Sequence, residues 1–126
     1  MKALQVIDQA FRTTTEEQDD TILWLTQSMQ GAGADLMLLL SGHGVQYAVI
    51  NEPQPALEIG SWQQTQPAEL KRDLSSLVEK NVPVYVVEED LVERGLDHLT
   101  LTAGIKKIKR TALANLYEHA DQVWHW

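Results

Sequence analysis

The sequence predicts an α/β fold in which a mostly parallel sheet of about five strands lies between helices on both faces. Short apolar runs alternate along the chain with segments whose apolar residues recur at helical spacing, which is typical of β-α-β units. One run, residues 35–40, is apolar throughout after its first residue, as expected for a strand covered on both faces. Right-handed crossovers then give a three-layer α/β/α sandwich. A length of 126 residues suits one core, so we expect residues 1–126 to form a single α/β domain.

The N-terminal half is expected to contain two strands and a helix between them. Residues 4–7 form the first strand, and residues 13–17 offer hydroxyl caps and first-turn carboxylates to the helix. The apolar residues of this helix recur at Ile22, Leu25 and Met29. Residues 35–40 form the second strand, and residues 41–44 predict a tight loop that leads into a short helix. Residues 51–67 hold three of the four prolines and predict an irregular excursion.

The C-terminal half repeats the alternation. Residues 69–80 predict the clearest helix, whose apolar stripe is made by Leu70, Leu74, Leu77 and Val78. Residues 82–87 form an apolar strand that turns acidic and continues as a short helix ending at a glycine. Residues 105–108 are a weaker strand, Thr111 is expected to cap the next helix, and residues 122–126 are expected to form the last strand.

Composition limits the classes of function. A net charge of -8 disfavours binding to nucleic acid, because such binding neutralises phosphates with Lys and Arg. The chain has no cysteine, which excludes disulfides, zinc-thiolate sites and thiol nucleophiles. No apolar run approaches the ~20 residues that a bilayer requires, and the N-terminus lacks the apolar segment of a signal peptide. We therefore expect a cytoplasmic protein that contacts neither membrane nor nucleic acid.

The basic residues are concentrated in one run near the C-terminus. This run consists of Lys106, Lys107, Lys109 and Arg110. Two interpretations are open. The run offers a patch to an acidic partner, or it is the solvated edge of a sheet that lysines keep from aggregating, which we favour.

Polar residues follow the predicted strands at their carboxyl ends. In a parallel sheet these ends share one edge, where ligands usually bind. The candidate residues are Asp8, Ser41, Gly42, His43, Gly44, Glu88, Glu89 and Asp90. The glycines permit close backbone approach, and a histidine between them can bind or titrate near neutrality. The alternative is a turn that requires glycine and carries an exposed histidine.

The acidic turn at residues 88–90 also has two interpretations. Three carboxylates can hold a magnesium ion. However, consecutive side chains point to different sides, and carboxylates at a helix start are favoured by the helix dipole. We favour this capping role and expect neither a metal nor a cofactor. The sequence contains no glycine-rich phosphate loop and no nucleophile elbow.

Tryptophans mark a candidate interface. Trp124 and Trp126 end the chain, and aromatic residues at a terminus indicate that it is tied into packing. Tryptophan is also enriched where proteins meet, so we expect these two residues or Trp62 to contribute to a face buried between chains. Core packing within one chain is the alternative.

Three segments carry a family resemblance. They are the apolar strand with its Gly-Val helix start at residues 36–45, the strand at residues 84–87 that continues to Arg94 and Gly95, and the C-terminal strand ending in tryptophan. Together they resemble the DsrE/DsrF/DsrH-like sulfur-relay proteins, and the last two look most like the DsrH/TusB branch. The resemblance implies a small α/β fold that assembles into dimers, trimers or hexamers. It also implies a role in passing sulfane sulfur between proteins, as in tRNA thiolation or sulfur oxidation.

The resemblance also implies where the sulfur chemistry should be. Catalytic relatives carry the persulfide on a cysteine at the end of the third strand, and this position corresponds to Val87. Valine is not a nucleophile, so the prediction leans against an enzyme. It favours a non-catalytic DsrH/TusB-like subunit that assembles as a homo- or hetero-oligomer with DsrE-like subunits or docks a sulfur-carrier protein. Two alternatives are a small-molecule or metal binder using His43 and residues 88–90, and a homo-oligomer of this fold without a sulfur role.

Overall fold

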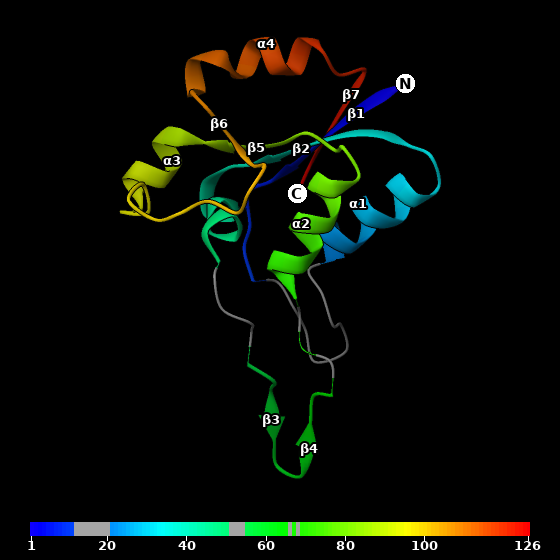
Figure 1. The fold of residues 1–126 in the computed structure, drawn as a ribbon, viewed down its shortest axis with the longest axis vertical. Helices are drawn as coiled ribbons and strands as arrows, with labels where there is room; N and C mark the ends of the chain where they lie inside the picture. The colour runs from blue at the N-terminus through cyan, green and yellow to red at the C-terminus, as the bar shows by residue number, and fades with distance from the viewer. Residues whose placement is uncertain (12–20, 51–54, 66, 68) are drawn as a thin grey trace.

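The computed structural model describes residues 1–11, 21–50, 55–65, 67 and 69–126. Its centre is a sheet of five strands in the order β6-β5-β2-β1-β7 (Figure 1). The strands are β1 (Lys2–Ile7), β2 (Asp35–Leu40), β5 (Val84–Val87), β6 (Lys106–Ile108) and β7 (Gln122–His125). Every neighbouring pair in this sheet is parallel, which confirms the predicted α/β fold with a parallel sheet.

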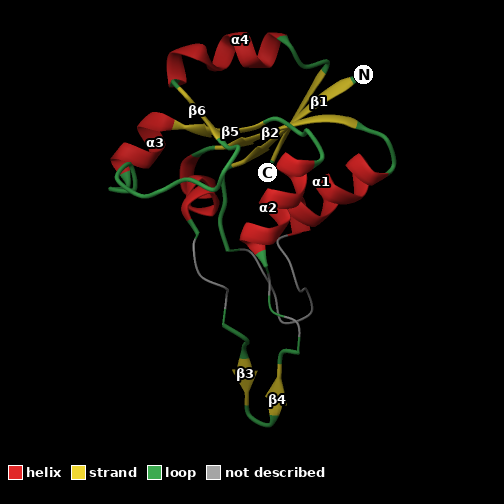
Figure 2. Ribbon diagram, in the orientation of Figure 1, coloured by secondary structure: helices red, strands yellow, loops and turns green. Residues whose placement is uncertain are grey.

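Helices lie on both faces of the sheet (Figure 2). One face is covered by α1 (Thr21–Gly31), α2 (Leu70–Glu79) and the 3₁₀ helix η1 (Gly42–Val49), and the other by α4 (Leu113–Glu118). The short α3 (Glu88–Glu93) follows β5, and the 3₁₀ turn η2 (Arg110–Ala112) follows β6. Within the described residues, no helix is both long and apolar enough to cross a membrane.

Side-chain alternation along the central strands divides the core into two unequal parts. In β2, Leu36, Leu38 and Leu40 face the larger cluster, which also contains Leu74 and Leu77 of α2. The intervening side chains face a smaller cluster, which contains Leu4, Val6, Met37, Leu39, Val87 and Leu116. Both faces of β2 are therefore apolar because both are covered, which is why its sequence shows no polar alternation.

The predicted helix at residues 69–80 is confirmed as α2, with a difference of one residue at each end. Its Leu70, Leu74 and Leu77 are buried at helical spacing, so burial of one face fixes its position. Asn81 ends the segment in a left-handed conformation with φ of 63°, and Pro83 prevents the helix from continuing.

Two predicted loops contain regular structure. The segment at residues 41–44 was expected to be a loop before a helix, but the 3₁₀ helix η1 already begins at Gly42. The region at residues 51–67 was expected to be irregular, but it contains the strands β3 (Glu58–Ile59) and β4 (Trp62–Gln63). These pair as an antiparallel hairpin that projects from the body of the molecule (Figure 1). Each strand has two residues, too few to produce a periodic pattern.

Thr111 does not cap α4, contrary to the prediction. The residue preceding α4 is Ala112, which makes no side-chain capping hydrogen bond. Thr111 instead lies inside η2, which begins one residue earlier at Arg110. The caps predicted at residues 13–17 lie outside the described residues.

Gly44 is required by close packing between η1 and β1. A β-carbon placed on Gly44 would lie 2.1 Å from the carbonyl oxygen of Ile7, and backbone cannot move aside as a flexible side chain can. We predict that Gly44→Ala lowers the free energy of unfolding by about 3 kcal/mol or more, the upper range for overpacking. The measurement is urea unfolding followed by far-UV circular dichroism.

The matched control is Gly31→Ala at the end of α1, where an added β-carbon meets no atom within 4 Å. Stability of this variant should be unchanged or higher by up to about 1 kcal/mol, because alanine favours helix over glycine. Equal destabilisation by the two substitutions would contradict the close approach at Gly44.

Candidate functional site at the carboxyl edge of the sheet

The parallel arrangement brings the carboxyl ends of all five strands to one edge of the sheet. The residues that follow these strands are Asp8 after β1, Ser41 after β2, Glu88 after β5, Lys109 after β6 and Trp126 after β7. This is the edge at which ligands usually bind in α/β proteins. The sequence expectation that strand ends concentrate polar residues is therefore met in the structure.

Asp90 links three of these strand ends. One of its oxygens, Oδ2, accepts a hydrogen bond from the Gly42 amide at 2.9 Å, and Oδ1 accepts one from the guanidinium of Arg110 at 2.6 Å. Only 12% of the Asp90 side chain is exposed, whereas the Arg110 side chain is 50% exposed, so the carboxylate is largely buried and the guanidinium stays at the surface. The carboxylate thus joins the start of η1 after β2, helix α3 after β5 and the turn after β6.

Gly42 is suited to this link by its backbone. Its φ of +53° lies in the left-handed region, which disfavours side chains, and a β-carbon there would lie 3.2 Å from the carbonyl oxygen of Asp8. As the first residue of η1, its amide has no acceptor within the helix. The Asp90 carboxylate supplies that acceptor.

Arg110 joins the edge strand β6 to helix α3 through both its backbone and its side chain. Its amide donates to Glu89 Oε2 at 2.9 Å and Oε1 at 3.0 Å, and its guanidinium reaches Glu93 Oε1 at 3.3 Å as well as Asp90. Hydrogen bonding, first to Asp90 and then to Glu93, raises the pKa of Arg110 above its ordinary value. The guanidinium therefore carries its positive charge throughout the physiological pH range.

A second cluster surrounds Asp8 at the other half of the edge. The Ser41 hydroxyl donates to Asp8 Oδ1, and His125 Nε2 contacts Oδ2 of the same carboxylate. The Asp8 amide donates to the Trp126 carbonyl at 3.1 Å. A nucleophilic serine requires the histidine to lie between it and the carboxylate. Here the carboxylate lies between serine and histidine, so the cluster fixes the C-terminal strand and does not activate Ser41.

The C-terminal tryptophan is tied to the centre of the sheet. Trp126 Nε1 donates to Gln5 Oε1 at 2.6 Å, and Gln5 is fully buried. Trp124 Nε1 donates instead to Gln122 Oε1 at 3.2 Å on its own strand. Trp62 lies on the projecting hairpin, well apart from the C-terminus (Figure 1). The three tryptophans that the sequence grouped as interface candidates therefore do not form one face.

Val87 occupies the last position of β5 and is the residue before α3. Its side chain is 1% exposed and packs in the smaller core cluster with Leu116 of α4. The position that the resemblance assigns to the persulfide cysteine thus contains an apolar side chain that water does not reach.

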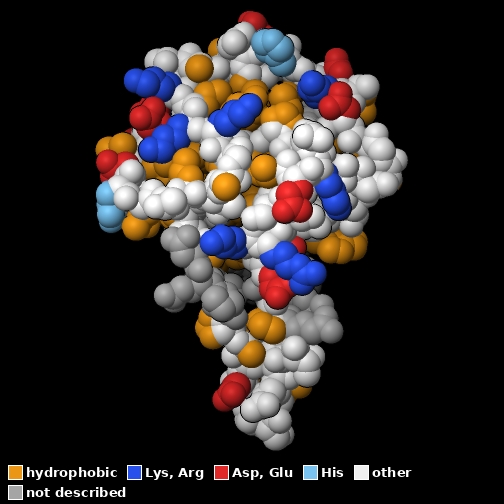
Figure 3. Space-filling view, viewed as in Figure 1, with side chains coloured by type: hydrophobic (Ala, Val, Ile, Leu, Met, Phe, Trp, Pro, Cys, Tyr) orange, Lys and Arg blue, Asp and Glu red, His pale blue; other side chains and the backbone are white. Residues whose placement is uncertain are grey.

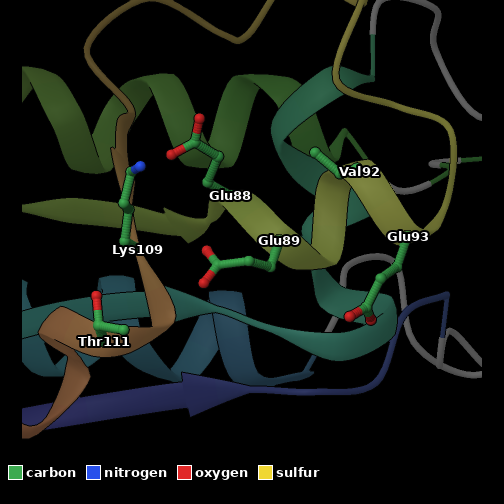
Figure 4. A pocket seen from close by; sticks show the side chains of 6 residues that line it. All are labelled: Glu88, Glu89, Val92, Glu93, Lys109 and Thr111. Carbon is green, nitrogen blue, oxygen red and sulfur yellow. The ribbon is translucent and has the colours of Figure 1, made fainter.

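An open pocket of ≈ 630 Å³ lies between α3 and the segment after β6. It is lined by Glu88, Glu89, Val92, Glu93, Lys109 and Thr111 (Figure 4). Glu88 and Lys109 point to the same side, so the pocket presents both charges together with an exposed apolar residue, Val92. Such a lining suits a charged segment of a protein better than an apolar ligand.

The predicted site residues are only partly brought together. Gly42 and Asp90 are in contact, and Glu88 and Glu89 line the pocket, but His43 is exposed and is not among its lining residues. Across the described part of the chain, no three histidine or carboxylate side chains are grouped so as to hold a metal ion. The carboxylates of α3 lie in its first turn, as predicted, but those of Glu89 and Asp90 bond to neighbouring elements.

Arg110 and His125 were not identified as site residues from the sequence. Each follows or ends an edge strand, at the same edge as the predicted carboxylates. The available signal was a charged or titratable residue at the end of a predicted strand or within two residues of it. Pairing it with a particular carboxylate requires the strand order.

We predict that Asp90→Ala destabilises the protein by about 2 kcal/mol, because it leaves the Gly42 amide and Arg110 without their shared partner in a shielded position. Asp90→Asn keeps an acceptor and should lose less. Glu93→Gln is the control, since this exposed carboxylate should change stability by no more than about 0.5 kcal/mol. Urea unfolding measures all three variants. An Asp90→Ala protein as stable as the wild type would show that the carboxylate does not link these elements.

Comparison with known proteins places the chain by fold. No family model matches the sequence, and no curated protein matches it. Among solved structures, it is similar to the YchN protein from E. coli, with a TM-score of 0.76 and 22% sequence identity. The match covers 99% of this chain and 98% of YchN. The chain therefore shares the α/β fold of YchN, with its parallel sheet of five strands.

Proposed function

We propose that this chain is a non-catalytic, DsrH/TusB-like subunit of a sulfur-relay system, which acts in assembly or docks a sulfur-carrying partner. Relays of this kind serve tRNA thiolation and sulfur oxidation. The observation that carries the proposal is the buried valine at the end of β5. The chain has the YchN-like fold, but Val87 stands where the resemblance places the persulfide cysteine. The sequence has no cysteine at any position.

The chemistry of the edge supports a role without catalysis. Sulfane sulfur is carried on a thiolate, and the chain has no cysteine, so none of its side chains can form a persulfide. Two of the three carboxylates that follow Val87 are also occupied, because Asp90 and Glu89 are bonded to Gly42 and Arg110. Their contacts hold strand ends together and do not converge on a position where a substrate atom would react.

The pocket beside α3 is the docking site in this proposal. One of its lining residues is Glu88, which follows Val87 at the carboxyl end of β5, and Glu88, Val92 and Lys109 give the pocket charge and apolar surface. A partner segment that carries its own persulfide would lie against α3 at the position where catalytic relatives place theirs. The subunit would then orient the sulfur carrier without handling the sulfur.

A second candidate function is small-molecule binding, and the pocket volume of ≈ 630 Å³ favours it. This volume lies within the ~300–1,000 Å³ range of ligand sites. The version that joins His43 to residues 88–90 is less favoured, because His43 is not among the residues that line the pocket.

We predict that a cysteine at the family position is unreactive in this protein. In Val87→Cys, the thiol should take the place of the valine side chain, which is 1% exposed. Burial in apolar surroundings raises the pKa of a thiol and so lowers its reactivity. A thiol reagent should label the native variant slowly and the urea-unfolded variant rapidly. Rapid labelling of the native protein would show that the site is open and would weaken the non-catalytic interpretation.

Binding to a relay protein tests the proposal directly. A DsrE-like subunit or a sulfur-carrier protein is used as bait in a pull-down, and its affinity for the wild-type chain is then measured by calorimetry. Glu88→Lys reverses a charge in the pocket and should weaken binding about tenfold or more, about 1.4 kcal/mol. Glu118→Lys, an exposed change on α4, should leave the affinity unchanged. The proposal would be refuted if neither the DsrE-like subunit nor the sulfur-carrier protein bound the chain.

A further inference from the structure

The basic run of the sequence lies on one free edge of the sheet. β6 pairs with β5 on one side, and no described strand pairs with its other side. Four of the ten Lys and Arg residues of the chain lie at residues 106–110, whereas residues 98–117 contain no Asp or Glu. Lys and Arg side chains gather on the part of the surface where β6 lies (Figure 3). A chain with a net charge of -8 therefore has a basic strip along one strand, and we call residues 106–109 the basic edge.

The lysines of the basic edge are not used within the chain. Arg110, which follows them, is bonded to Asp90 and Glu93. By contrast, the side chains of Lys106, Lys107 and Lys109 are exposed, and they make no hydrogen bond or ion pair with any residue that the structure describes. Their charges are therefore available to a partner.

Protection against aggregation does not by itself account for these lysines. Lysines on an edge strand do hinder its pairing with other chains. However, β7 is the opposite edge of the same sheet, has four residues against three in β6, and leaves Val123 43% exposed. It contains neither Lys nor Arg. If lysines served only to guard an edge, the longer and more apolar edge would require them at least as much.

Side-chain alternation along β6 defines which kind of strand fits beside it. The register pairs Lys106 with Tyr85 and Lys107 with Val86, so the two lysines lie on opposite faces of the sheet. Ile108 is on the same face as Lys106 and is partly buried. A strand added at this edge matches β6 when two consecutive acidic residues, one on each face, meet the lysines and an apolar residue meets Ile108.

A protein strand suits the basic edge better than other anionic partners. The free side of an edge strand offers backbone N–H and C=O groups, which an added strand can pair with. A nucleic acid cannot form this ladder, and the net charge of -8 repels its phosphates. None of the described strands of this chain has two consecutive acidic residues, so the strands of a second copy do not match. The partner that matches is a different protein.

We infer that the basic edge binds an extended acidic segment of another protein, which joins the sheet as a further strand beside β6. Main-chain hydrogen bonds hold this segment, and Lys106 and Lys107 select consecutive carboxylates. Lys109, which also lines the pocket beside α3, extends the charged contact past the end of β6. The inference applies whether or not the partner carries sulfur, so it does not rest on the proposed function.

The test uses the full chain and short synthetic peptides with blocked ends, without any relay protein. The probe peptide has two consecutive glutamates between valine and threonine residues, which favour extended structure. It should bind in calorimetry, more weakly as salt is raised, and should slow hydrogen exchange of amides in β6. The same peptide with N-methylated backbone amides should bind about tenfold more weakly or worse, because it cannot donate to the edge. A peptide with lysines in place of the glutamates should not bind.

Charge reversal identifies the lysines that bind. Lys106→Glu combined with Lys107→Glu should weaken binding of the acidic peptide by about tenfold or more, because each position changes from attraction to repulsion. Lys71→Glu combined with Lys80→Glu is the control, since these exposed lysines of α2 and its C-cap change the net charge equally. This control should leave the affinity nearly unchanged. Far-UV circular dichroism confirms that each variant is folded.

Four results would overturn the inference. The acidic peptide does not bind even at low salt, or the N-methylated peptide binds equally well. The two double variants lose the same affinity, which would show that only net charge matters. Lastly, single-stranded DNA of the same charge binds as tightly as the peptide, because phosphates do not require a strand edge.

Discussion

The Asp90 carboxylate is the contact on which the carboxyl edge of this protein depends. A parallel sheet brings strand ends together, but it does not connect the loops that follow them. Asp90 connects three of these segments by accepting from the Gly42 amide and from Arg110. Because the Asp90 side chain is largely buried, loss of this carboxylate leaves the Gly42 amide without an acceptor. The same contact commits the charge of Asp90 to structure, at the edge where α/β proteins usually bind ligands.

Different parts of the molecule are left for binding. Val87 closes the end of β5 with an apolar side chain, and Asp8 and Gln5 hold the C-terminal strand in place. The open pocket beside α3 has mixed charge, whereas the hairpin at residues 55–65 carries a single charged residue, Glu58. These two surfaces therefore suit different kinds of partner.

The sequence predicted those parts of the structure that depend on local periodicity. The apolar run at residues 35–40 and the helical stripe at residues 69–80 became β2 and α2, because burial on both faces or on one face leaves a direct pattern. The candidate carboxylates at strand ends were also placed correctly. Their partners, Arg110 and His125, were not found. Arg110 lies just after the edge strand β6 and His125 ends the edge strand β7, and the neighbours of these strands are set by strand order. The hairpin was missed because two-residue strands have no detectable period.

Amide hydrogen exchange at Gly42 measures the central contact most directly. This amide begins a helix, where amides have no acceptor in the helix itself, and its acceptor is a side chain from another element. We expect it to exchange slowly, at a rate comparable to that of the neighbouring Ser41 amide, which donates to the Ile7 carbonyl at 3.0 Å. Exchange of Gly42 at the rate of an unprotected amide, with Ser41 still protected, would show that Asp90 does not hold the edge together.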